Sequence, residues 1–305
     1  MFVLGEVKTM AQILRSLAHW VRDKVQPPPS DQKLLDDFSF ALDRIERRVP
    51  MLGSYSRIEP YLLDCEQSGL RFRFLVYHME SRNWFDNDNR IEGCLQMTTE
   101  CTLVSPGQTV FDLGCNSGFL TTWFAKKVGP TGRVLAFDPF PWNTLATSFS
   151  ARLNRCHNVR CHTVGIADDQ RTVQIPFYDS KIYEGIGVNR NQTFAAKLVP
   201  LDHFASDRPQ FIKVDIEGAE RDLLRGAAKL VTRQPQPTWY IEVHHSFIRS
   251  AGADPDQIAR DFVAHGYDCH IHHPRGESFA TLGTLPEGCG MFAIPTKRNA
   301  GGLES

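Results

Sequence analysis

The sequence lacks the cysteine pattern of several kinds of site. None of its 8 cysteines belongs to a Cys-x-x-Cys pair, so a zinc site built from cysteines is not expected. Several of them fall in segments that we predict to be buried strands, which indicates reduced thiols and a cytoplasmic protein. No internal repeat is visible either, so a solenoid or propeller is not expected.

The chain also has no block of like charge and no long apolar run near its start. Lys and Arg total 34 against 35 for Asp and Glu, and this balance gives no basis for nucleic-acid binding. The first apolar residues are interrupted by Glu6 and Lys8, so we expect neither a signal peptide nor a membrane span. Apolar residues make up 42% of the 305 residues, enough for a packed globular core.

The first part of the chain predicts two helices. Apolar residues recur at helical spacing over 11–25, and a run of three prolines then ends that helix. Ser30 or Asp31 can cap a second helix that ends before Pro50. We assign 1–60 to a helical N-terminal extension. It could serve packing or homodimer contacts, which such apolar stripes usually indicate, or act as a lid or a membrane-surface helix.

The remainder predicts one domain over 70–298, followed by a flexible tail over 299–305. Short β-rich runs alternate with helical segments here, which is typical of an α/β fold with a doubly wound, mostly parallel, seven-stranded sheet. The polar segment 172–200 is interpreted as an insertion near the site. The predicted strands are 109–113, 133–138, 159–164, 211–215, 238–243, 267–272 and 290–295.

The most informative motif follows the first of these strands, in the run Asp-Leu-Gly-Cys-Asn-Ser-Gly over 112–118. A strand, a glycine turn and a helix start bring backbone close to a ligand at the carboxyl edge of a sheet. Asn116 replaces the middle glycine that a dinucleotide needs, which disfavours a nicotinamide-dependent oxidoreductase. A leading carboxylate favours a cationic ligand, such as the methionine part of S-adenosylmethionine. We therefore expect Asp112, Gly114, Asn116 and Gly118 to hold that part.

Acids end four of the predicted strands, at Asp112, Asp138, Asp215 and Glu242. The carboxyl ends of parallel strands lie on one edge, so these side chains should converge. Asp138 can accept both hydroxyls of a ribose, or else cap the helix that begins near Pro141. Asp168 could meet an adenine edge, although Gly-Ile-Ala-Asp is also an ordinary turn.

Taken in order, these motifs resemble the FkbM family of S-adenosylmethionine-dependent methyltransferases. The resemblance covers about residues 70–295 and includes the glycine turn, the acid-proline pair at Asp138, Val-Pro-Leu-Asp over 199–202, Ile-Lys-Val-Asp-Ile-Glu-Gly-Ala-Glu over 212–220 and Ile-Glu-Val-His over 241–244. This chain departs from the family at Cys115 and Ser117, and at Asp138, where the family usually has Glu.

The resemblance implies a class I Rossmann-like fold, S-adenosylmethionine as the methyl donor and O-methylation of a small-molecule hydroxyl. Acceptors in the family are sugars, polyketides and related metabolites of natural product biosynthesis. The alternative is a non-catalytic methyltransferase-like protein that binds a partner through its N-terminal helices. A carboxylate and an imidazole retained together at the strand ends, Glu242 and His244, argue against that alternative.

An alcohol acceptor must lose its proton, and the residues allow two routes. In one, His244 is the base and a carboxylate orients it, because an ordinary imidazole pKa suits proton transfer at neutral pH. In the other, Asp215, Glu217 and Glu242 are oxygen ligands for Mg²⁺. Glu220 is interpreted as a helix-start acid without a catalytic role.

Overall fold

A computed structural model describes residues 29–49, 56–86, 103–176, 193–272 and 277–296. The chain divides into two compact units, 1–41 and 42–305. Helix α2 (Pro29–Glu46) confirms the second predicted helix and begins at a proline, which suits a first helical turn. The predicted helix over 11–25 and the tail over 299–305 lie outside the described residues.

A β-hairpin precedes the main sheet. Strands β1 (Arg57–Gln67) and β2 (Leu70–His78) pair antiparallel, and Ser68 and Gly69 between them have positive φ angles of 50° and 73°, as a tight two-residue hairpin turn requires. Helix α3 (Met79–Asp86) follows directly. The sequence analysis missed β1, because it is half-exposed on both faces and so shows little alternation of apolar and polar residues.

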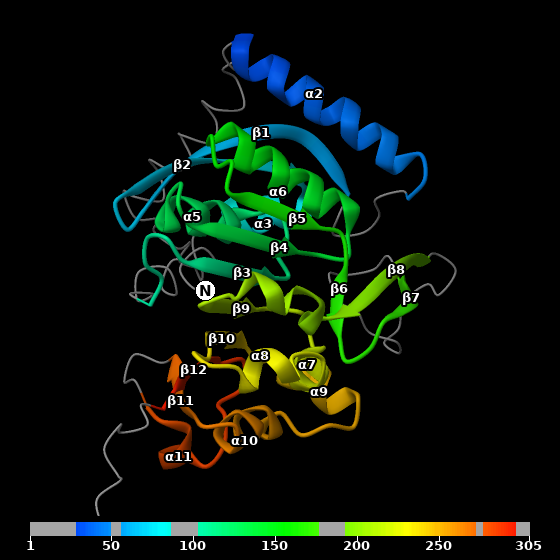
Figure 1. The fold of residues 1–305 in the computed structure, drawn as a ribbon. Coiled ribbons are helices and arrows are strands. Elements are labelled where there is room, and N and C mark those ends of the chain that lie inside the picture. Colours follow the sequence, from blue (N-terminus) through cyan, green and yellow to red (C-terminus); the bar gives the residue numbers. More distant parts are fainter. Residues whose placement is uncertain (1–28, 50–55, 87–102, 177–192, 273–276, 297–305) are drawn as a thin grey trace, which may run out of the picture. The chain divides into compact units, whose positions relative to one another are not determined.

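The predicted sheet is present, with seven strands in the order β11-β12-β10-β9-β3-β4-β5. Figure 1 shows these strands stacked from β5 to β11. Only β12 runs antiparallel to its neighbours, whereas β10, β9, β3, β4 and β5 are parallel. The predicted α/β fold with a mostly parallel seven-stranded sheet is therefore confirmed. The strands are β3 (Thr109–Leu113), β4 (Arg133–Phe137), β5 (Val159–His162), β9 (Phe211–Val214), β10 (Thr238–Glu242), β11 (Tyr267–His272) and β12 (Gly290–Pro295).

Both faces of the sheet are buried. Neighbouring residues of β3 belong to different apolar clusters, Val110 to one and Phe111 to the other, because successive side chains of a strand point to opposite faces. The hairpin and α5 cover one face, and α7, α8 and α10 cover the other. The helices are α5 (Phe119–Val128), α6 (Pro141–Leu153), α7 (Glu220–Gly226), α8 (Ala228–Thr232), α9 (His245–Ser250), α10 (Asp256–Ala264) and α11 (Phe279–Leu282), with a 3-10 helix η2 (Leu201–Asp207).

A second, three-stranded sheet corrects the predicted strand over 159–164. Strand β5 ends at His162, and the chain then forms β6 (Gly165–Ala167), which pairs with β8 (Thr193–Pro200); β7 (Arg171–Pro176) pairs with β8 on its other side. A Cβ atom on Gly165 would lie 2.5 Å from Leu198 Cδ2, so glycine permits this close pairing. Strands β7 and β8 therefore occupy the two ends of the predicted insertion over 172–200, whose residues 177–192 lie outside the described part.

No helix among the described residues has the length and apolar character needed to span a membrane.

Candidate functional site

A cavity lies at the carboxyl ends of the central strands, where the sequence predicted the site. Its lining combines apolar rings with amide and carboxylate groups. It is formed by Trp84, Gly114, Asn116, Phe137, Asp138, Pro139, Phe140, Val164, Gly165, Ile166, Asp215, Ile216 and Glu217. Of the expected cofactor residues, Gly114, Asn116 and Asp138 reach this cavity.

The glycine turn brings the ends of β3 and β9 together. Gly114 has φ 74°, and a Cβ atom there would lie 1.7 Å from the carbonyl oxygen of Asp215. Gly118, with φ 87°, plays a different part, because a Cβ atom on it would lie 2.7 Å from Thr147 Cα in α6. Gly118 is thus needed for helix packing at the start of α5, whereas Gly114 both permits the close approach and faces the cavity.

Asp112 lies beneath the turn instead of facing the cavity. Its side chain is fully buried, and Thr121 Oγ1 donates a hydrogen bond of 2.5 Å to Oδ2. Lys213 Nζ lies 3.5 Å from Oδ1. Burial raises the pKa of Asp112, although Lys213 and Thr121 oppose that shift. The structure therefore gives Asp112 a supporting position, not the direct ligand contact that the sequence suggested.

Asp138 is held in place by three hydrogen bonds. Its Oδ2 accepts one from the backbone N–H of Asn116 at 2.9 Å, and its Oδ1 accepts others from Phe140 N–H at 2.9 Å and Asn143 Nδ2 at 3.1 Å. The N-cap of α6 is Phe140, so Asp138 is not the helix cap considered above. Burial raises the pKa of Asp138 to about 7 despite these donors.

Asp168 does not reach the cavity. Its Oδ1 lies 2.7 Å from Arg171 Nη1 and its Oδ2 lies 3.4 Å from Arg225 Nη2. The neighbouring Gly165 and Ile166 line the cavity in its place. An adenine contact through the Asp168 carboxylate is therefore not supported by its position.

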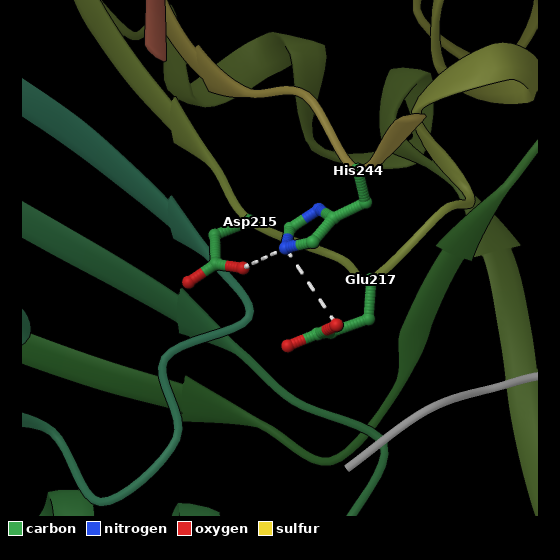
Figure 2. Close-up of side chains that lie close together, drawn as sticks. All are labelled: Asp215, Glu217 and His244. Carbon is green, nitrogen blue, oxygen red and sulfur yellow. Dashed lines mark ion pairs between the residues drawn. The ribbon is translucent and has the colours of Figure 1, made fainter. Parts of the chain in front are cut away.

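The ends of β9 and β10 bring together a second group of residues, centred on His244 (Figure 2). His244 lies just beyond β10, at the N-cap of α9. Its Nε2 is 3.6 Å from Asp215 Oδ1, 3.6 Å from Glu217 Oε2 and 3.9 Å from Glu242 Oε1. The structure thus confirms that the four predicted catalytic side chains converge.

The charge balance of this group changes the expected role of His244. Burial disfavours the imidazolium, but the hydrogen bond to Glu220 and the charges of Asp215 and Glu217 raise the pKa of His244 to about 10. Burial and the nearby Asp215 charge raise the pKa of Glu217 to about 8. With its pKa raised to about 10, His244 does not have the ordinary imidazole pKa on which the base interpretation relied.

Two charged residues of this site were missed or misread from the sequence. Glu220 does lie in the first turn of α7, but its side chain is 0% exposed and its Oε1 lies 2.9 Å from His244 Nδ1. Lys213, also buried, has its Nζ 3.2 Å from Asp215 Oδ2 and 2.9 Å from the carbonyl oxygen of Gly114. A lysine within the apolar run of β9 was the sequence signal for it, because a buried lysine needs a partner.

Asp215, Glu217 and His244 also form a set of potential metal ligands. One donor atom from each lies within 4.8 Å of the others. The predicted set had Glu242 as its third member, but the structure brings the imidazole nitrogen between the two carboxylates. This set of one nitrogen and two oxygens differs from the all-oxygen site expected for Mg²⁺.

The chain is similar to solved methyltransferases, at low sequence identity and low TM-score. Fibrillarin from Aeropyrum pernix, with bound S-adenosyl-L-methionine, is 12% identical, with 81% of this chain and 86% of that chain covered and a TM-score of 0.40. A SAM-dependent O-methyltransferase from Thermotoga maritima is 10% identical, with 78% and 79% covered and a TM-score of 0.40.

Sequence comparison identifies relatives directly. Methyltransferase 1 from Beauveria bassiana (strain ARSEF 2860) is 27% identical over 143 residues, which cover 38% of this chain and 57% of that protein. The match thus spans little more than half the length of this relative. Residues 112–269 match the family described as Methyltransferase FkbM domain, and they include the glycine turn, Asp138, the end of β9 and His244. Since the match extends over more than half of the sequence, the chain belongs to the FkbM methyltransferase domain family.

Proposed function

We propose that this protein transfers the methyl group of S-adenosylmethionine to a hydroxyl oxygen of a small-molecule acceptor. The observation that carries the proposal is the position of Asp138, a fixed carboxylate in a cavity whose walls include Phe137, Phe140 and Ile166. Apolar walls suit an adenine ring, and a carboxylate suits the paired hydroxyls of a ribose.

The lining of the cavity fits the charge of this donor. The donor carries a sulfonium and an ammonium group, and it supplies an activated methyl carbon with a neutral thioether as leaving group. Asp215 and Glu217 also line the cavity, so carboxylates are available for the cationic part. Asp112 would act from below, by fixing Thr121 and Lys213 behind the glycine turn.

The residues around His244 would bind and orient the acceptor hydroxyl. The acceptor oxygen forms a bond to the methyl carbon as the carbon–sulfur bond breaks, and its proton must go to a base. His244 could accept this proton only after losing its own, because its pKa is raised to about 10. Glu242, whose pKa is raised to about 7 by the nearby Asp215 charge and by burial, can accept a proton at neutral pH. A bound divalent cation, Mg²⁺ in the sequence interpretation, would offer the second route by acidifying the hydroxyl.

Sugar or polyketide hydroxyls are the proposed acceptors on the basis of the family resemblance. The test is calorimetric titration of the purified protein with S-adenosylhomocysteine, followed by assays of radiolabelled methyl transfer to a panel of glycosides and polyketides. We expect saturable binding and transfer to at least one hydroxyl. Absence of any binding would overturn the proposed donor. Binding with transfer only to nitrogen or carbon acceptors would overturn O-methylation.

A further inference from the structure

The group around His244 has the spacing of a metal site. Three donors that each lie about 2.1 Å from one ion are about 3.0–3.4 Å apart. His244 Nε2 is 3.6 Å from an oxygen of both Asp215 and Glu217, and the three donor atoms lie within 4.8 Å of one another. Only small side-chain movements are needed to bring all three onto one ion. Figure 2 shows both carboxylates directed toward the same nitrogen.

The opposite nitrogen of the ring is held as a metal-bound histidine requires. Glu220 Oε1 lies 2.9 Å from His244 Nδ1, and the Glu220 side chain is 0% exposed. A buried carboxylate on Nδ1 fixes the ring orientation and leaves Nε2 as the donor. The other Glu220 oxygen, Oε2, is buried without a hydrogen-bond partner among the described residues. Glu220 Oε1 also accepts a hydrogen bond from the backbone N–H of Ile216 at 3.3 Å, so the carboxylate that holds the ring is itself fixed in place.

The surrounding charges favour the same conclusion. Glu242 Oε1 lies 3.9 Å from His244 Nε2, so a third carboxylate lies near the same imidazole nitrogen. Lys213 is already shared between Asp112 and Asp215, and its side chain is buried. The group around His244 therefore contains more carboxylates than positively charged side chains. Like charges at such distances repel one another strongly in a partly buried site.

From this geometry we propose that Asp215, Glu217 and His244 bind a divalent transition-metal ion of the Mn²⁺ or Zn²⁺ class. An imidazole donor favours these ions over Mg²⁺, which prefers oxygen ligands alone. Three protein ligands leave positions open for water and a hydroxyl oxygen, and Asp215 and Glu217 face the cavity. The catalytic role of the ion, which is to acidify the acceptor hydroxyl, rests on the proposed methyl transfer; its binding does not.

The test uses the full-length protein after treatment with a chelator and dialysis. Mn²⁺ is added and followed by electron paramagnetic resonance, and Zn²⁺ and Mg²⁺ are titrated by calorimetry. We expect one Mn²⁺ per chain, a pulsed-resonance signal from one directly bound imidazole nitrogen, and at least tenfold weaker binding of Mg²⁺. Lack of Mn²⁺ binding, lack of the nitrogen signal, or equal affinity for Mg²⁺ would each overturn the proposal.

Variants locate the site. His244→Gln and Asp215→Asn should each weaken Mn²⁺ binding at least 100-fold, and Glu220→Gln should weaken it about 10- to 100-fold. His157→Gln, which changes an exposed histidine in the loop before β5, should leave it unchanged. Unaltered Mn²⁺ affinity in folded His244→Gln protein would refute the assignment. S-adenosylhomocysteine binding to the metal-free protein is measured in parallel, so failure of the donor proposal is distinguishable from failure of the metal proposal.

Discussion

The carboxylates at the ends of β3 and β4 have different surroundings from those at the ends of β9 and β10. At the ends of β3 and β4, Asp138 accepts three hydrogen bonds from N–H groups, and Asp112 is paired with Thr121 and Lys213. At the ends of β9 and β10, by contrast, Asp215, Glu217, Glu242 and Glu220 all lie around the single ring of His244.

This difference separates a fixed binding surface from a charged one. Carboxylates that are held by several hydrogen bonds, as Asp138 is, keep their geometry and present a constant shape to a ligand. Carboxylates that share one cation retain excess negative charge, so they favour any cation that enters. On the proposed function, the β3–β4 half would hold the ribose of the donor, and the β9–β10 half would contact its cationic part and activate the acceptor.

The largest expected effect is a loss of turnover when His244 is removed from the β9–β10 half. His244→Ala should lower the rate of methyl transfer about 10²- to 10⁴-fold, because it removes the group that all four acids contact. Affinity for S-adenosylhomocysteine should change less than about threefold, since His244 does not line the cavity. Single-turnover kinetics and calorimetry measure the two quantities. A large loss of donor affinity would show that the halves are not separate.

A second prediction concerns Gly114, where the ends of β3 and β9 lie close together. Gly114→Ala forces a Cβ atom to 1.7 Å from the Asp215 carbonyl oxygen, and overpacking of this kind costs about 3 kcal/mol. The matched control is Gly252→Ala. Gly252 has nearly the same φ, 73° against 74°, but no atom lies within 4 Å of its added Cβ, so only backbone strain of about 1 kcal/mol remains. Urea unfolding compares the two variants, and equal losses would contradict the close approach.

Third, Asp138→Ala should weaken S-adenosylhomocysteine binding about 10- to 100-fold, because hydrogen bonding of the ribose to a charged group is lost. Turnover at saturating donor should change far less. Equal donor affinity in wild type and variant, measured by calorimetry, would remove Asp138 from the ribose site.

The pH dependence of donor binding gives the same residue a distinct signature. Burial raises the pKa of Asp138 to about 7, and only the ionised carboxylate can accept both ribose hydroxyls. Donor affinity should therefore be constant above pH 7 and fall as the pH drops below it, by up to about tenfold per unit. In the Asp138→Ala variant, donor affinity should not change with pH over that range. An affinity that still falls with pH in the variant would mean that another group titrates.

The sequence predicted the strands and turn of the β3–β4 half better than the side-chain contacts of either half, and the reason is local. The strand, glycine turn and helix around Gly114 follow from short-range patterns, and so does the acid at the end of β4. The group around His244 depends on side chains from α7 and from the loop after β10, whose directions no periodicity gives. Glu220 has an ordinary position in a first helical turn, and only the packed structure shows that it is buried against His244.

The smallest expected effect concerns the contact between Glu220 and His244. It is measured as the free energy of unfolding of the metal-free protein. The pKa of His244 is raised from 6.5 to about 10, so the imidazolium stabilises the fold fully below pH 6.5, and this contribution is lost as the pH rises through about 10. Glu220→Gln keeps a hydrogen-bond acceptor but removes one charge. It should therefore lower the free energy of unfolding by about 1 kcal/mol at pH 6, with a difference that shrinks toward pH 10. Because Glu220 also repels Glu217, the loss at high pH should be smaller still or reversed. Urea unfolding at both pH values in the presence of a chelator measures this, and a loss that grows with pH would mean that Glu220 does not stabilise a charged His244.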